Sequence, residues 1–318
     1  MKNWSNLAKV VYKRTYSRVD TGVSENWEDT VNRVIAGNTQ AFNVSQEEKD
    51  RLKFFMMSRK AIPAGRGLWY SGSPSHKKIG GAALNNCWFV SGDDIDNFTL
   101  AMDLLMLGGG VGLSIEHKFV SKLPKIKKNV QITHRATKDA DFIVPDSREG
   151  WVELYKRLLE AFFVTGRSFS YSTVCIRNYG EKIEGFGGVA SGAQPLIKFI
   201  DSLVTLLTSR EGRSVRPIDA MDMLCLTGEM VVSGNVRRSA IIILGDAFDK
   251  EYLKAKRWDL GQVPSFRAFA NLSIVIDDTE DAHPLFWKTY EHGEPFGIVN
   301  RKNIQMYARM GQKKKDTA

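Results

Sequence analysis

The sequence contains little cysteine. Three cysteines stand among 318 residues, at Cys87, Cys175 and Cys225, and no Cys-X-X-Cys pair occurs. Three thiols are too few for a disulfide-stabilised scaffold, and the five histidines form no His-X3-His pair. We therefore expect neither a disulfide framework nor a metal site formed by side chains of this chain.

Long apolar runs are also missing. No run approaches the roughly 20 residues that a membrane-spanning helix requires. The first residues, MKNWSNLAKV, lack the apolar core of a secretory signal peptide. These two absences predict a cytoplasmic protein with no membrane partner.

The composition that remains is that of an ordinary soluble protein, with 43% hydrophobic and 25% charged residues. The length allows one large domain or two small ones. The formal net charge is +9, which suits polyanionic ligands such as nucleotide phosphates or nucleic acid. The dense basic runs, KLPKIKK at 122–128 and KKK at 313–315, are interpreted more simply as a solvated loop and a frayed tail.

The first 80 or so residues have a helical pattern. Ser45 and Glu48 form the spacing of a capping box at the start of one helix. The segment IPAGRGLWYSGSPSHKKIGG at 62–81 is rich in glycine, proline and serine and shows no clear period. It is predicted to be a long ordered loop, and such loops are often functional.

From Leu84 onward, strand patterns and helix patterns alternate, which is typical of an α/β fold. Asp146 and Glu149 predict a capped helix that buries Trp151, Tyr155 and other apolar residues on one face. The predicted strands cover 86–90, 111–116, 170–176, 239–245, 270–277 and 296–300. The other predicted helices cover 96–107, 195–209, 217–232 and 283–293. A parallel or mostly parallel sheet follows, either open or closed into a barrel.

Two glycine-rich segments attract a nucleotide interpretation. GGGVGL at 108–113 follows a helix and precedes a strand, which is the reverse of a dinucleotide fingerprint, so its glycines are expected to end the helix and allow close packing. GFGGVASG at 185–192 precedes a helix with Pro195 in its first turn. Its amides suit phosphate, but it lacks the Lys-Ser/Thr ending of a P-loop, so a plain loop is an equal alternative.

Two further features leave alternatives open. Arg237 and Arg238 are adjacent before a strand, so at most one of them faces a given site, and both are also compatible with surface roles. Cys87 opens a strand between amide side chains and apolar residues. It is interpreted either as a small buried hydrophobe or as a thiol at a strand end where chemistry is placed. Cys175 and Cys225 look structural.

Taken together, the motifs resemble those of ribonucleotide reductases, most closely the monomeric, adenosylcobalamin-dependent class II ribonucleoside-triphosphate reductases. The similar segments are LNNCWFV, GGGVG, PDSREGW, IRNYGEKIEGFGGVASG, SGNVRRSA and GEPFGIVN, which occur here in the family's order. The resemblance implies an α/β fold in which a helical N-terminal region (1–83) precedes the first half of a ten-stranded α/β barrel (84–318). An insertion that builds the effector site is expected at about 117–170.

The resemblance also implies roles for individual residues. Cys87 matches the first redox cysteine, one of two thiols that become a disulfide as the ribose 2′-hydroxyl is reduced. The substrate is expected near Asn86 and near Ala64 and Gly65, where the family often has Ser or Thr in place of Ala64. Asp94 and Arg177 match effector-binding positions. The residues expected to form the specificity loop are Gly185, Gly187, Gly188, Ser191 and Gly192.

One departure from the family pattern is large. The family carries its catalytic cysteine and glutamate in an NPCxE motif after the GEPFGIVN region, and no such motif stands among these residues. The partners that the resemblance implies are a ribonucleoside triphosphate, a deoxynucleotide effector, a thioredoxin-like reductant and a separate C-terminal half that holds adenosylcobalamin.

Two other functions remain as alternatives to this split reductase. One is a non-catalytic nucleotide-binding or regulatory remnant of a reductase. A nucleic-acid-binding protein is the least supported, because no binding motif and no interleaving of aromatic and basic residues occurs. We therefore expect no direct nucleic-acid partner.

Overall fold

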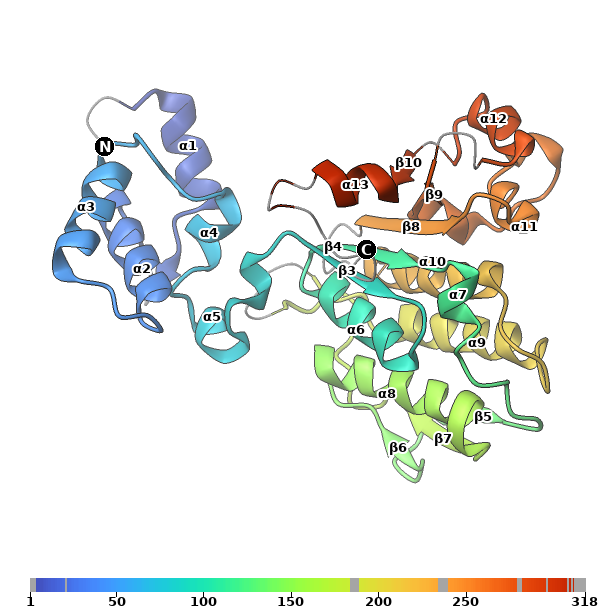
Figure 1. The fold of residues 1–318 in the computed structure, drawn as a ribbon. Helices are drawn as coiled ribbons and strands as arrows, with labels where there is room; N and C mark the ends of the chain where they lie inside the picture. The colour runs from blue at the N-terminus through green and yellow to red at the C-terminus, as the bar shows by residue number, and fades with distance from the viewer. Residues whose placement is uncertain are drawn as a thin grey trace. The chain divides into compact units, whose positions relative to one another are not determined.

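The computed structural model describes residues 4–20, 22–183, 189–233, 240–278, 282–295, 297–307, 309 and 311. The chain divides into two compact units, Met1–Asn86 and Cys87–Ala318. Each unit has its own elements, many of which Figure 1 labels. The two units are described separately below.

The N-terminal unit is mainly helical, as the sequence predicted. Its capping box is present, because the Glu48 carboxylate accepts the backbone N–H of Ser45 at 2.8 Å and the Ser45 hydroxyl accepts that of Glu48. A short antiparallel pair of strands within it was not predicted. The elements are α1 (Asn6–Thr15), β1 (Val19–Asp20), β2 (Val23–Ser24), α2 (Trp27–Thr39), α3 (Gln46–Met57), α4 (Gly65–Tyr70), α5 (Pro74–Ile79) and the 3₁₀ turn η1 (Gly81–Leu84).

The predicted loop at 62–81 is wrong in its local structure, because most of it is helical. Ser73 caps α5 by accepting the His76 N–H, and Pro74 occupies its first turn. The buried Tyr70 hydroxyl donates to the carbonyls of Ser75 and Gly80. These tertiary hydrogen bonds fix helices that are too short to show a sequence period.

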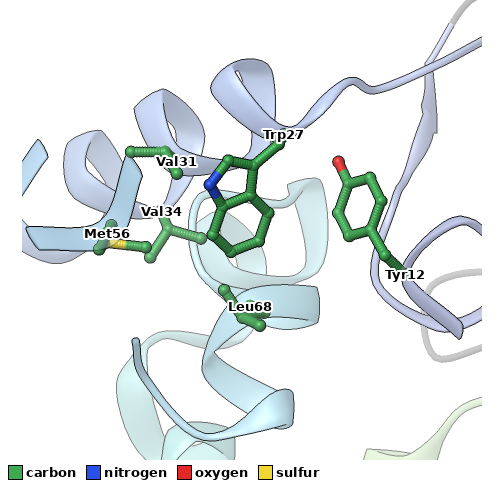
Figure 2. Packing of buried hydrophobic residues seen from close by; sticks show 6 residues of the cluster. All are labelled: Tyr12, Trp27, Val31, Val34, Met56 and Leu68. Atoms are coloured by element: carbon green, nitrogen blue, oxygen red, sulfur yellow. The ribbon is translucent and has the colours of Figure 1, made fainter. Parts of the chain in front are cut away.

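The core of this unit is an aromatic and aliphatic cluster that α1, α2, α3 and α4 contribute. Figure 2 shows its buried members, Tyr12, Trp27, Val31, Val34, Met56 and Leu68. The rings of Trp4, Tyr12 and Trp27 meet edge to face, with 5.3–5.6 Å between ring centroids. Aromatic pairs favour this arrangement. Burial of this cluster holds the short helices together.

The second unit is built on a five-stranded sheet with strand order β10-β9-β8-β4-β3, and every neighbouring pair is parallel. The prediction of a parallel sheet is confirmed. The strands are β3 (Cys87–Ser91), β4 (Gly110–Ser114), β8 (Ala240–Asp246), β9 (Asn271–Ile276) and β10 (Gly297–Asn300).

Helices cover one face of this sheet. Val111, Leu113, Ile241 and Ile243 point to that face and are buried, and α6 and α10 pack on the strands that carry them. Cys225 lies within α10, where burial raises the pKa of its thiol to about 12, so its predicted structural role is confirmed. The helices and helical turns of this unit are α6 (Ile95–Met106), α7 (His117–Val120), α8 (Arg148–Glu160) with the π-helical turn η2 (Ala161–Thr165), α9 (Gln194–Thr208), α10 (Pro217–Ser233), α11 (Lys250–Leu253), η3 (Trp258–Leu260), η4 (Ser265–Phe269), α12 (Pro284–Tyr290) and α13 (Arg301–Tyr307).

The glycines of GGGVGL serve the packing role that the sequence predicted. Gly108 ends α6 with φ of +77°. A Cβ atom on Gly109 would lie 1.7 Å from the Trp88 ring, and one on Gly112 would lie 2.4 Å from the Phe89 ring. Both positions therefore need the absence of a side chain.

A second, smaller parallel sheet has the order β5-β7-β6 and consists of β5 (Ile132–His134), β6 (Phe142–Ile143) and β7 (Phe169–Ser172). The sequence predicted only β7, and it extended that strand too far. Because β7 ends at Ser172, where its pairing with β6 ends, Cys175 is exposed and does not have the structural role predicted for it.

The predicted cap of α8 was also wrong. Ser147, not Asp146, accepts the Gly150 N–H at 3.0 Å, because the Asp146 carboxylate instead binds Arg177. Elsewhere the part of the chain that the structure describes contains no helix long and apolar enough to cross a bilayer.

The close approach of α2 to residues 71–72 gives a testable prediction for the N-terminal unit. A Cβ atom on Gly37 would lie 2.2 Å from the Gly72 nitrogen, a backbone atom that cannot rotate away. Gly37→Ala should therefore lower the free energy of unfolding by about 1–3 kcal/mol, although alanine favours helices by roughly 1 kcal/mol. Hydrogen exchange of α2 amides in urea measures this effect.

Gly81→Ala is the matched control, because nothing lies within 4 Å of its Cβ position and its φ is not positive. This variant should be neutral or slightly more stable. Equal stability of the two variants would contradict the packing of α2 described here.

Candidate functional site

Cys87 is the first residue of β3, at the N-terminal edge of the five-stranded sheet. The strand register places it beside Gly110 on β4, which in turn pairs with Ala240 on β8. The Cys87 Sγ lies 3.5 Å from the position that a Cβ atom on Gly110 would take. The thiol therefore stands at the end of a row of small residues that leaves space next to the sulfur.

The same register decides which face of the sheet carries the thiol. Side chains alternate between faces along a strand, so Phe89 shares the face of Cys87, and Gly112 and Ile242 continue that row across β4 and β8. Phe89 is 55% exposed and Ile242 is 39% exposed. Among the described residues, the N-terminal part of this face is thus open and apolar, whereas helices cover the opposite face.

Cys87 is exposed and free, which removes its interpretation as a buried hydrophobe. Cys175 and Cys225 are also free, and Cys225 is buried in the helix that covers the opposite face. The described part of the structure therefore contains no disulfide at Cys87.

The C-terminal part of the open face is closed by an ion-pair cluster that sequence reasoning missed. Buried Glu116 accepts the Ser114 hydroxyl at 2.9 Å and pairs with Arg301 at 2.5 Å. Arg301 also reaches Asp277 at 3.2 Å. Each charged residue directly follows a strand or lies two residues beyond one, a position that could have suggested the cluster. It joins the ends of β4, β9 and β10.

The residues expected at the substrate, Asn86, Ala64 and Gly65, all belong to the N-terminal unit. Asn86 is exposed and directly precedes Cys87 in the chain. Ala64 and Gly65 lie at the start of α4 in the N-terminal unit. Ala64 is exposed, and Gly65 has no room for a side chain because a Cβ atom there would lie 2.7 Å from the Tyr16 ring.

Asp94 and Arg177, both expected at the effector, are not joined by any contact among the described residues. Asp94 caps α6, where its carboxylate accepts the Asp96 N–H at 3.0 Å. Ion pairs of Lys156 with Asp96 and of Arg148 with Asp103 show that α6 and α8 run antiparallel. Nine residues of helix, about 14 Å, therefore separate the Asp94 end of this pair from the end near Arg177.

Arg177 holds the base of the predicted specificity loop. Its Nε donates to Asp146 at 2.7 Å, and its Nη1 donates to the Lys182 carbonyl at 3.0 Å. Lys182 pairs with Val189 in an antiparallel bridge, and Gly180 and Ala190 are also hydrogen-bonded. The two arms of the loop are thus tied together at its base.

The tip of this loop carries three of the predicted glycines, Gly185, Gly187 and Gly188, which lie outside the described residues, as do Arg237 and Arg238. Gly192, at the other end of the loop, has φ of +70°, and a Cβ atom there would lie 3.2 Å from the Tyr179 nitrogen. Its conformation favours glycine.

A cavity of about 310 Å³ lies next to this end of the loop, between α9 and α10. Part of its lining is apolar, with Phe199, Leu226 and Met230, and the ion pair of Lys198 with Glu229 at 3.0 Å also lines it. Ser191 and Tyr179 connect it to the loop. This cavity has no signature in the amino-acid sequence, because its walls come from two different helices, α9 and α10.

Comparisons with known proteins agree with this architecture. Residues 120–207 match the family model of the B12-dependent ribonucleotide reductase insertion domain, and residues 1–73 match that of the ribonucleotide reductase alpha domain. A crystal structure of a B12-dependent, class II, ribonucleotide reductase superposes with a TM-score of 0.78 at 30% identity, over 98% of this chain and 51% of the other.

Curated relatives agree with the family models and with the crystal structure. Proteins named adenosylcobalamin-dependent ribonucleoside-triphosphate reductase are 32% identical in Lactobacillus acidophilus and 35% identical in Euglena gracilis, over 97% and 98% of this chain. The matches cover 50% and 44% of those relatives, so the chain spans about half the length of the proteins it matches. Over 97–98% of its length, this chain is therefore similar to adenosylcobalamin-dependent, class II, ribonucleotide reductases.

Proposed function

We propose that this chain supplies the N-terminal half of a reductase that converts ribonucleoside triphosphates to 2′-deoxyribonucleotides for DNA synthesis. The observation that carries the proposal is the exposed thiol of Cys87, at the end of a parallel strand, beside the small residues Gly110 and Ala240. A ribose that approached this edge would find a reducing group and room for the sugar ring.

The role proposed for Cys87 is that of a reductant. When the 2′-hydroxyl leaves as water, the C2′–OH bond is replaced by C2′–H, which needs two electrons. Cys87 and a second thiol each give up a hydrogen atom, and a sulfur–sulfur bond forms between them. A thioredoxin-like dithiol then restores both thiols by exchange. Asn86, Ala64 and Gly65 are proposed to bind the substrate.

Adenosylcobalamin, which the relatives' names specify, does not fit the cavity described here. A corrin ring with its nucleotide tail is several times larger than a space of about 310 Å³. We therefore assign no residue of this chain to the cofactor and derive no step through it. Its site and the second reducing thiol are proposed to lie in the complementary half, whether that half is part of the same polypeptide or a second one.

The loop from Gly185 to Gly192 is proposed to couple a deoxynucleotide effector to the choice of substrate base. Support comes from its base, where Arg177 binds both Asp146 and the Lys182 carbonyl. An effector phosphate that drew Arg177 away from Asp146 would break the ion pair that holds Arg177 at the base of the loop. Asp94, which caps the N-terminal end of α6, is also proposed to contact the effector.

Cys87→Ser should abolish turnover of the reconstituted enzyme with thiol reductants, because a hydroxyl cannot form the disulfide. Cleavage of adenosylcobalamin should persist, since radical formation would use a different cysteine. Measuring deoxynucleotide formation and cofactor cleavage in parallel separates the two steps. Cys175→Ser is the control, because Cys175 is exposed but follows β7 in the smaller sheet, and it should retain activity. Wild-type turnover by the Cys87 variant would disprove the assignment.

Gly192→Val should alter which bases are reduced in response to each effector, with less effect on substrate affinity. A β-branched residue disfavours the positive φ of this position. The measurement is the kcat/KM of all four substrates with each effector. Gly212→Val is the control, because Gly212 also has positive φ but belongs to the turn after α9. An unchanged effector response in the Gly192 variant would count against the coupling role.

The chain alone should catalyse no reduction, and addition of the complementary half should produce adenosylcobalamin-dependent activity. The open edges of the five-stranded sheet predict an interface of roughly 2,000 Å² or more between this chain and the complementary half. Activity assays and analytical ultracentrifugation of each half and of the mixture measure both expectations. Activity from residues 1–318 alone would overturn the placement of the catalytic groups. Tight nucleotide binding without activity in the mixture would favour a regulatory remnant.

A further inference from the structure

The basic run at 122–128 is a loop with exposed lysines, as the sequence predicted, but its backbone is anchored to the protein. Leu123, Ile126 and Val130 are buried, each at most 4% exposed, so they anchor the segment at three points. The Ile126 N–H donates to the Arg213 carbonyl at 3.0 Å, and the Lys127 N–H donates to the Phe162 carbonyl at 2.7 Å. The backbone that carries these lysines is thus fixed on both sides.

The same bonds bring together three segments that are far apart in the sequence. Residues 122–130 lie against 164–168, at the C-terminal end of η2, and against 208–214, at the C-terminal end of α9. In Figure 1 this region lies near the ends of α9 and β5. The three segments contain seven Lys or Arg residues and one carboxylate, Glu211.

Most of these cations have no ion-pair partner among the residues that the structure describes. Lys122 pairs with Asp93 and Arg210 pairs with Asp219, while Glu211 accepts the backbone N–H of Asn129 at 3.1 Å. Five exposed cations remain for which the described part of the chain provides no ion pair. We call this set the basic surface, and it consists of Lys125, Lys127, Lys128, Arg167 and Arg213.

The chemistry of the basic surface narrows the class of partner that it can bind. The three segments contain no aromatic residue, so they offer no platform on which unpaired bases stack. Protein interfaces are depleted of lysine and are centred on aromatic or aliphatic anchors, but the large apolar side chain exposed here is Val164 alone. Cations without such anchors suit a row of phosphates.

We propose that the basic surface binds the phosphate backbone of double-stranded nucleic acid, without reading its sequence. This inference is independent of the reductase function, and it departs from the expectation that nucleic acid is not a partner. Contacts with phosphates release counterions from the duplex. The affinity is therefore low at physiological salt and rises steeply as the salt concentration falls. The anchored backbone fixes where the charges stand, although each side chain remains free to move.

The test uses the full chain and a fluorescein-labelled 24-base-pair duplex, with binding followed by anisotropy from about 50 to 300 mM NaCl. The triple variant Lys125→Gln, Lys127→Gln, Lys128→Gln should lose at least about tenfold in affinity at the lowest salt. The slope of log K against log salt should fall in magnitude by about 2–3. Arg213→Gln alone, on a different segment, should reduce the slope by about 1.

The matched control is Lys250→Gln, Lys254→Gln, Lys288→Gln, which removes the same charge from exposed lysines on or beside α11 and α12. It should change affinity by less than about threefold. Equal losses in the two triple variants would reduce the effect to net charge and overturn the proposal. Absence of duplex binding at low salt would also overturn it. So would displacement of the labelled duplex by poly-glutamate or tripolyphosphate, if these polyanions were as effective as unlabelled duplex at the same concentration of charge.

Discussion

The parallel register of β3, β4 and β8 is the constraint on which the site depends. It aligns Cys87 with Gly110 and Ala240, and it sends Val111 and Ile241 to the opposite face. A shift of one residue in any of these strands would exchange the two faces, bury the thiol against helices and expose the core. The hydrophobic effect that packs α6 and α10 on one face is therefore also what keeps the thiol on the other.

The two ends of the sheet are treated differently. At the C-terminal end, Glu116 and Arg301 form a partly buried ion pair between residues 185 positions apart, which ties β10 to β4 across two intervening strands. At the N-terminal end, where Cys87 stands, the face is open. The ion pair thus positions the strands from the opposite end of the sheet to the one where the thiol stands. Strands β3 and β10 form the edges of the sheet, and such edges favour pairing with further sequence.

Several elements followed from sequence because their causes are local. The capping box of Ser45 and Glu48, the proline starts of α9 and α10, and the helix end at Gly108 depend on neighbouring residues only. Other predictions failed where a distant partner decided the outcome. Asp146 binds Arg177 instead of capping α8, and Tyr70 fixes short helices in a segment whose composition suggested a loop. The second sheet was missed because its strands have only two to four residues.

The amino-acid sequence by itself determined the alternation of strands and helices, the parallel sheet and the family resemblance, because periodicity and motif order are properties of the chain. It also identified Cys87, Arg177 and the glycine loop as candidates. Only the tertiary structure decided that Cys87 is exposed beside small residues and that Asp94 and Arg177 stand at opposite ends of a helix pair. It also decided that five cations converge with no ion pair to any described residue. These outcomes depend on strand register and on contacts between residues tens of positions apart, which a linear pattern does not contain.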